Sequence, residues 1–199
     1  MPSADRDDLL LQRLEAALPR VLEGLKGSHF DRYSFLRSRL FERDVSRDGN
    51  FQRTFNGLYR VRRNSEWKGH YYRLMEREKT RASVEFGELL VELYNATGRI
   101  EASFVSKLVA IIHPEYAVYD SVVSANLGLV PPRYYDPPAL RLAGMGLTYA
   151  ELNARMNGLI RHPRFPALKV QLAAAFPVSE LTDLRVLDLL LWQLRPEHG

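Results

Sequence analysis

Cysteine is absent from the 199 residues of this chain. Disulfide bonds, thiolate catalysis and zinc or iron–sulfur sites held by cysteine are therefore excluded. The composition is otherwise close to that of a globular protein, with 46% hydrophobic, 11% aromatic and 26% charged residues. A chain without thiols is compatible with a reducing cytoplasm, and we expect the protein to act there.

Long apolar runs and ligand-rich motifs are missing as well. No window approaches the roughly 18 uninterrupted apolar residues that a membrane span needs, and the N-terminus, MPSADRDDLLLQRL, lacks the basic start of a secretory signal. The five histidines show no metal-ligand spacing. A phosphate-binding or dinucleotide-binding glycine fingerprint is also missing. We therefore expect no membrane segment, no metal site and no cofactor.

The alternation of apolar and polar residues that is typical of β-strands is also missing. Apolar residues instead recur at helical spacing along almost the whole chain. This periodicity predicts an all-α protein of nine or ten helices. We expect a compact multi-helix fold in which residues 1–199 form a single α-helical domain; the alternative is a fold of two small helical lobes. Two of the apolar stripes are Leu10, Leu14, Leu18 and Val21, and Phe86, Leu89, Leu90, Leu93 and Tyr94.

Turn residues mark where these helices end. The segments Ser46–Asn50 and Thr97–Arg99 contain glycine, and Pro114 follows an apolar helix. The longest interruption is Val130–Gly146, which holds four prolines, two glycines and a pair of tyrosines. Because flexible linkers rarely carry so many large apolar side chains, we expect this stretch to be an ordered surface loop.

The positive charge is concentrated in one part of the chain. Residues 53–81 contain nine Lys or Arg and three Glu, an excess of +6, although the whole chain carries only +4. Such a face suits a polyanion, because neutralising phosphates supplies most non-specific affinity for nucleic acid. The alternative is a solvated helix face without a partner. The basic residues that we expect to bind nucleic acid here are Arg60, Arg62, Arg63, Lys68 and Arg73.

A single carboxylate, Asp120, separates an apolar approach from a helical run in the stretch EYAVYDSVVSANLGL. An aspartate in this place is a good N-cap, because its oxygens accept the unpaired N–H groups that open a helix. The same position keeps the carboxylate ionised at neutral pH, where it is able to take part in chemistry. Capping and catalysis are both open to Asp120.

The order of elements around Asp120 resembles that of the helix-hairpin-helix DNA glycosylases. Within residues 84–129, a helix, a turn at Gly98, a second helix and an extended connection lead to Asp120. The family pattern Val-Asp-Thr/Ser-x-Val is matched by Val118, Asp120, Ser121 and Val123, with Tyr119 inserted. The wider stretch Asp48–Trp192 also looks like an uncharacterised bacterial branch of this superfamily.

The departures from the family pattern concern the hairpin itself. The family hairpin resembles Leu-Pro-Gly-Val-Gly, whereas this chain has Ala-Thr-Gly-Arg-Ile and keeps only Gly98 of the two glycines. Ile100 replaces the second glycine, at which the family brings its backbone close to a DNA phosphate. The lysine that bifunctional members use as a nucleophile falls on Ala102, so a lyase reaction is not expected.

The resemblance implies a DNA-binding protein that would hydrolyse the N-glycosidic bond of a damaged base, as a monofunctional DNA glycosylase in DNA repair. Asp120 would be the catalytic residue, and Gly98 and Arg99 would join the basic residues on the DNA. Two alternatives stay open. One is a DNA-binding module that kept the fold and lost the chemistry, and the other is a helical domain whose basic face meets an acidic protein.

A glycosylase also has to hold an extruded base against aromatic or apolar side chains. Aromatics interleave with the basic segment, and two more lie in the proline-rich stretch. Aromatics at helical spacing are more often core residues, so both interpretations remain. The candidates for base contact are Tyr59, Trp67, Tyr71, Tyr72, Tyr134 and Tyr135.

Overall fold

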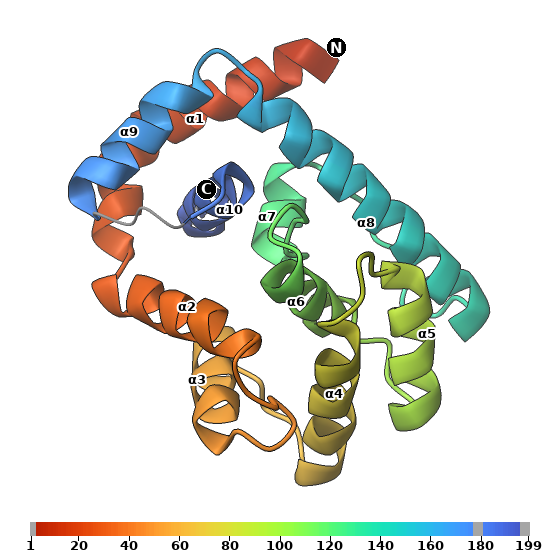
Figure 1. Cartoon of the computed structure of the whole chain (residues 1–199). Coiled ribbons are helices and arrows are strands. Elements are labelled where there is room, and N and C mark those ends of the chain that lie inside the picture. The colour runs from red at the N-terminus through yellow and green to blue at the C-terminus, as the bar shows by residue number, and fades with distance from the viewer. Residues whose placement is uncertain (1–2, 177–180, 196–199) are drawn as a thin grey trace. The chain divides into compact units, whose positions relative to one another are not determined.

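The computed structural model describes residues 3–176 and 181–195, and within these ranges the chain is all-α, with ten helices and no strand (Figure 1). The prediction of an all-α protein with nine or ten helices is therefore confirmed. The helices are α1 (Ser3–Gly24), α2 (Gly27–Leu40), α3 (Gly49–Tyr59), α4 (Ser65–Glu78), α5 (Phe86–Thr97), α6 (Ala102–Ile112), α7 (Ser121–Asn126), α8 (Pro138–Ile160), α9 (Phe165–Ala175) and α10 (Asp183–Gln193).

The chain divides into two compact units, each assembled from separate stretches of sequence. The first unit takes residues 1–26, 114–131 and 147–199, and the second takes residues 27–113 and 132–146. The long helix α8 contributes its first residues to the second unit and the remainder to the first.

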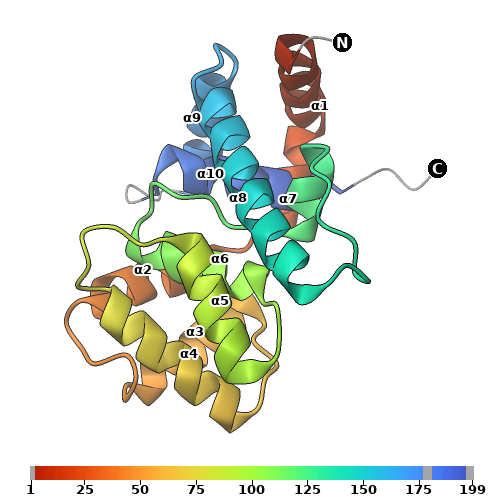
Figure 2. The same cartoon turned by 90° about the vertical axis from the view of Figure 1, so that its right-hand side faces the viewer.

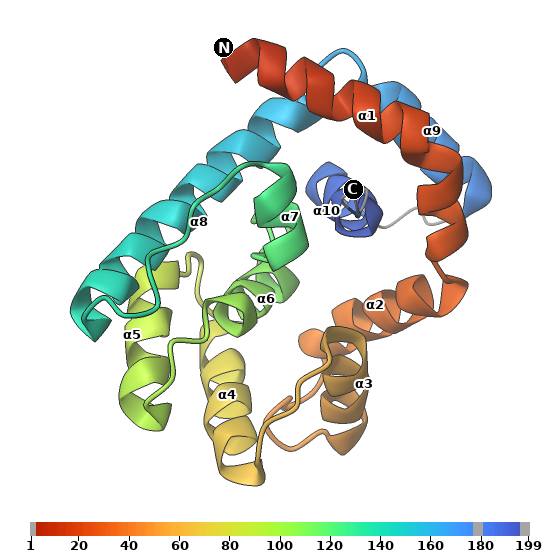
Figure 3. The same ribbon diagram turned by 180° about the vertical axis from the view of Figure 1, so that it is seen from behind.

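The first unit is built around α10, which packs against α1, α7 and α9 (Figures 1 and 3). The apolar face of α10 is fully buried through Leu187, Leu190 and Leu191. The amide of Asn126, at the end of α7, donates hydrogen bonds to the carbonyls of Leu191 (2.9 Å) and Leu194 (2.8 Å). These carbonyls lie at the end of α10 and have no partner within the helix, so Asn126 serves as their cap from another part of the chain.

The second unit packs α2 on α3, α4 on α5, and α6 against both α2 and α5 (Figure 2). Its core holds an aromatic cluster in which the ring of Tyr71 lies 4.9 Å from Trp67, 5.8 Å from Phe55 and 6.4 Å from Phe104. Arg37 of α2 donates to the carbonyls of Ile111 (2.5 Å) and Ile112 (3.3 Å), which closes the C-terminal end of α6.

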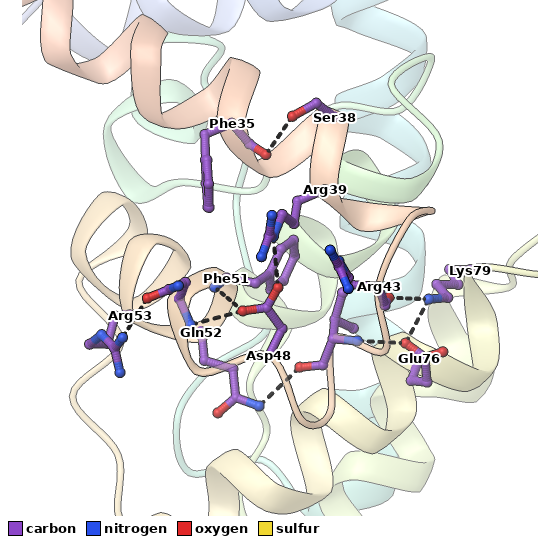
Figure 4. Close-up of polar contacts among 12 residues, drawn as sticks. Phe35, Ser38, Arg39, Arg43, Asp48, Phe51, Gln52, Arg53, Glu76 and Lys79 are labelled. Carbon is purple, nitrogen blue, oxygen red and sulfur yellow. Dashed lines mark hydrogen bonds and ion pairs between the residues drawn. The ribbon is translucent and has the colours of Figure 1, made fainter.

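A polar network fixes the start of α3 (Figure 4). Oδ1 of Asp48 accepts the N–H groups of Asn50 (2.9 Å) and Phe51 (3.1 Å), and Oδ2 accepts Nε of Arg39 (2.9 Å). The turn predicted at Ser46–Asn50 is present in its first part, but Gly49 and Asn50 already belong to α3. Asp48 is the N-cap of this helix and is tied to α2 by an ion pair.

The expectation of one loop from Val130 to Gly146 is wrong in its second half, because α8 begins at Pro138. A proline at the first position of a helix costs no hydrogen bond, since the N–H groups of that turn have no partner in the helix. The loop is thus confined to residues 130–137, and the glycines Gly144 and Gly146 lie inside α8.

The C-caps of α3 and α5 allow a matched test of backbone strain. Arg60 (φ 53°) and Gly98 (φ 68°) both have left-handed backbones, and Arg60 is the one residue other than glycine with this conformation in the described ranges. We expect Arg60→Gly to raise the free energy of unfolding by about 1 kcal/mol, and Gly98→Ala to lower it by about 1 kcal/mol. Chemical denaturation measures both, and a Cβ at Gly98 would meet no other atom within 4 Å. Changes of the same sign in both variants would contradict this interpretation.

Asp48 gives a prediction about acid stability. The hydrogen bond from Arg39 lowers the pKa of Asp48 below its ordinary value of 3.8. A carboxylate with a lowered pKa stabilises the fold above about pH 4, and this contribution is lost as the pH falls through the folded-state pKa. We expect Asp48→Ala to cost roughly 1–2 kcal/mol at neutral pH, and Asp48→Asn to cost less because asparagine still caps the helix. Urea unfolding at several pH values is the measurement, and a cost of Asp48→Asn that persists undiminished in acid would contradict the ionic explanation.

Candidate nucleic-acid interface

The turn that the sequence places at Gly98 joins α5 to α6. Gly98 is the left-handed C-cap of α5, and its N–H donates to the carbonyl of Tyr94 at 2.7 Å. The carbonyl of Glu101 then accepts the N–H groups of Phe104 (2.9 Å) and Val105 (3.0 Å) as α6 begins. The predicted helix, glycine turn and second helix are therefore present, and Ile100 lies half-buried in the turn.

A hollow of about 510 Å³ lies beside this turn. It is lined by the connection between α3 and α4, the first turns of α4, and the end of α5 with the residue after Gly98. Three of the predicted nucleic-acid-binding residues, Arg62, Arg63 and Arg99, thus come together from two segments far apart in sequence. The complete lining is Arg62, Arg63, Asn64, Glu66, Trp67, His70, Ala96, Thr97 and Arg99.

One carboxylate holds two of these three arginines. Nε and Nη2 of Arg63 donate to the two oxygens of Glu101 at 2.7 and 3.1 Å, and Nε of Arg99 lies 3.2 Å from Oε1. Glu101 is only 8% exposed, and its hydrogen bond raises the pKa of the Arg63 guanidinium. The guanidinium also lies 5.2 Å from the ring centre of Phe104. Arg63 is thereby fixed in position by an ion pair and an aromatic face.

Arg62 differs from Arg63 in having no carboxylate partner within residues 3–176 and 181–195. Its side chain is exposed at the hollow. An unpaired guanidinium next to two others is the group best placed to receive an anion, because it gives up no existing ion pair.

The other basic candidates lie outside the lining of the hollow. Arg60 is the exposed C-cap of α3, and Lys68 and Arg73 belong to α4. Nη2 of Arg73 lies 3.3 Å from Nδ1 of His70, which does line the hollow. Arg60, Lys68 and Arg73 therefore stay predicted contacts, without a shared cavity to support them.

Three of the aromatic candidates are enclosed in the core. Tyr71 is fully buried, its hydroxyl donates to the carbonyl of Phe104 at 2.8 Å, and burial raises its pKa well above the ordinary value. Tyr72 is also buried, and its hydroxyl donates to Oδ1 of Asn56 at 2.8 Å. Trp67 stacks on Tyr71, with the rings 17° apart, and is 4% exposed. Since these rings offer no open face for a base, the core interpretation that the helical spacing allowed holds for Trp67, Tyr71 and Tyr72.

The remaining aromatic candidates have other surroundings. Tyr59 is half-buried, and its ring centre lies 4.6 Å from Phe55. Tyr134 and Tyr135 are 81% and 85% exposed. They occupy the middle of a turn in which the N–H of Asp136 donates to the carbonyl of Arg133 at 3.2 Å. The guanidinium of Arg141 lies over the ring of Tyr134, 4.9 Å from its centre, and the exposure of the two tyrosines is compatible with stacking.

Asp120 is the N-cap of α7, as the sequence indicates. Its Oδ1 accepts the N–H of Val122 at 2.8 Å, and its side chain is half-buried. The approach to it is held in place because the N–H of Ala117 donates to Oδ1 of Asn153 (2.8 Å) and its carbonyl accepts the hydroxyl of Tyr149 (2.9 Å). The capping role of Asp120 is thus confirmed, and the oxygen that accepts the N–H of Val122 is Oδ1. Asp120 belongs to the first unit and the hollow to the second.

The role of Glu101 could not be derived from the sequence. Its spacing from Arg99 is short, but Arg63 lies 38 residues away, and nothing local links the two. The proximity of an acid to a glycine turn is the one available signal, and it does not identify a partner.

Among residues 3–176 and 181–195, no group of three or more His, Cys, Asp or Glu side chains is placed to hold a metal ion. None of the helices described there has the length and apolar character needed to cross a bilayer.

Comparison with known proteins finds no similar family, curated protein or solved structure: no family model matches the chain, and neither a curated sequence nor a solved fold is significantly related to it.

Proposed function

We propose that this protein binds DNA through the basic side chains gathered beside the turn between α5 and α6. The observation that carries the proposal is the convergence of Arg62, Arg63 and Arg99 on one hollow at Gly98. These arginines come from the segment with an excess of +6 and from the turn that resembles a DNA-binding hairpin.

The electrostatics of the site support a polyanion as partner. Glu101 neutralises part of the charge of Arg63 and Arg99, and Arg62 adds a third positive charge against the exposed carboxylate of Glu66. Arg63 is held by an ion pair and an aromatic ring, so little of its own side-chain entropy remains to be lost when a phosphate binds. A positive and open surface of this kind favours contact with the sugar–phosphate backbone.

The chemistry that the family resemblance implies would place the reaction at Asp120. Hydrolysis of an N-glycosidic bond builds positive charge on the sugar, and a carboxylate beside it stabilises that charge or orients the attacking water. The half-buried position of Asp120 and the hydrogen bond that it accepts from Val122 support a carboxylate with a fixed orientation. Monofunctional removal of a damaged base, in the cytoplasm, is accordingly the activity that we propose to test, and a DNA-binding module without chemistry is the alternative.

The DNA-binding proposal predicts the behaviour of the variant Arg62→Gln/Arg99→Gln. Arg63 is left in place, because its removal would deprive buried Glu101 of its closest cation. Loss of two phosphate contacts should weaken duplex binding about tenfold and reduce the slope of log K against log salt by about 2. Fluorescence anisotropy across a salt series measures both quantities.

A matched control is Arg47→Gln, which removes an 88% exposed arginine from the same unit. Arg47 lies outside the lining of the hollow, and its loss should change duplex affinity little. Equal effects of the control and the double variant would indicate a diffuse charge effect, and an absence of salt-dependent DNA binding in the parent would favour an acidic protein as partner.

The catalytic proposal predicts that Asp120→Asn keeps the fold and loses the chemistry. Asparagine is as good an N-cap as aspartate, so α7 should form normally. Base release from a panel of damaged duplexes should be abolished, whereas duplex affinity should be unchanged or higher because a negative charge is removed. Equal release by variant and parent would refute the role of Asp120, and release by neither would support the alternative without chemistry.

A further inference from the structure

The indole N–H of Trp67 is a buried donor that belongs to a residue in the lining of the hollow. Trp67 is 4% exposed and lines the hollow, and within the described part of the chain its Nε1 has no hydrogen-bond acceptor. A buried donor without an acceptor costs roughly 1–3 kcal/mol, so native structures seldom keep one without a reason. The faces of the ring are covered by Tyr71 and by the edge of Phe104. What this ring has left to offer is therefore a single N–H donor.

The surroundings of this donor favour an anion as its acceptor. Asn64, Glu66 and Trp67, at the N-terminal end of the 14-residue helix α4, line the hollow, and that end carries the positive side of the helix dipole. Oδ1 of Asn64 accepts a hydrogen bond from the backbone N–H of Trp67 at 2.9 Å and caps the helix. The guanidiniums of the hollow add full positive charges, of which Arg62 has no carboxylate partner in the described ranges.

We infer that the hollow binds one phosphate group. Arg62 would be its principal cation, and the indole N–H of Trp67 would donate a hydrogen bond to it. This inference deepens the proposed function, on which it rests, because it assigns one phosphate of the DNA backbone to one set of side chains. Glu101 is a positioning residue in this site, since it holds Arg63 and Arg99 at 2.7 and 3.2 Å. The volume of about 510 Å³ is sufficient for a phosphate together with its sugar.

Glu66 provides an internal check on this assignment. It is an exposed carboxylate in the lining of the same hollow, so it opposes an anion that binds there. Glu66→Gln should therefore strengthen phosphate binding, about threefold for a charge near the surface. Arg62→Gln should weaken it about tenfold, because a charge-assisted hydrogen bond is lost. Opposite effects of two neighbouring exposed residues are not expected from a general loss of structure.

The test uses the indole resonances of the full chain labelled with ¹⁵N. The protein has two tryptophans, and Trp192 lies in α10 of the other unit, where it serves as the internal reference. Inorganic phosphate is titrated against chloride at equal ionic strength, and a short duplex is added in a separate titration. We expect a saturable shift of the Trp67 resonance alone, with an affinity that Glu66→Gln raises and Arg62→Gln lowers.

The variant Trp67→Phe removes the donor and keeps an aromatic ring against Tyr71. Provided that circular dichroism shows it folded, it should bind phosphate about tenfold more weakly. If the variant does not fold, the phosphate and duplex titrations of the parent chain decide whether Trp67 responds to a bound phosphate. Unchanged phosphate affinity in a folded Trp67→Phe variant would overturn the role of the indole.

The outcomes separate this inference from the proposed function. A Trp67 shift with both phosphate and duplex supports the site, and a shift with duplex alone supports it for backbone phosphodiesters only. Salt-dependent duplex binding without any Trp67 shift overturns the site and leaves the proposed function standing. A phosphate-specific Trp67 shift in a protein that does not bind DNA supports the site for a small phosphate compound and overturns the proposed function.

Discussion

The hydroxyl of Tyr71 donates to the carbonyl of Phe104 in a position fully closed to solvent, and this bond ties α4 to α6. The carbonyl that it uses belongs to the first turn of α6, directly after the glycine turn. The ring of Tyr71 also stacks on Trp67, which lines the hollow. The aromatic core of the second unit therefore sets the distance between the two segments that supply the arginines, and those arginines depend on it for their position.

The buried carboxylate of Glu101 fixes the positions of two of the arginines in the hollow. A buried carboxylate is costly unless it is paired, and Glu101 is paired twice, with Arg63 and with Arg99. Pairing leaves these guanidiniums oriented without removing all of their charge, and the ring of Phe104 adds a second support under Arg63. Arg62, which lacks a carboxylate partner in the described ranges, is then the side chain with the most to gain from an external anion.

Local features of this protein could be predicted from the sequence, and long-range ones could not. Helical periodicity, the glycine at the end of α5 and the aspartate at the start of α7 are properties of a few neighbouring residues, and all three are present as expected. The burial of Tyr71 depends on α6, whose residues lie about 30 positions away, so the same spacing that suggests a stacking surface also produces a core. The start of α8 at Pro138 was missed because two adjacent prolines indicate a loop, although the second is acceptable as a first helical residue.

The turn between α5 and α6 holds a single glycine, Gly98, and this has a physical consequence for how a phosphate could be recognised here. A glycine lets the backbone N–H approach an anion closely, whereas the side chain of Ile100 adds bulk at that position. Side chains have a longer reach, and Arg62, Arg63 and Arg99 line the hollow beside the turn in this protein. Recognition by guanidiniums relies on full charges, so it should depend on salt more steeply than recognition by backbone dipoles alone. A turn with one glycine could therefore bind a phosphate if the charged side chains of Arg62 and Arg99 take the place of close backbone N–H donors.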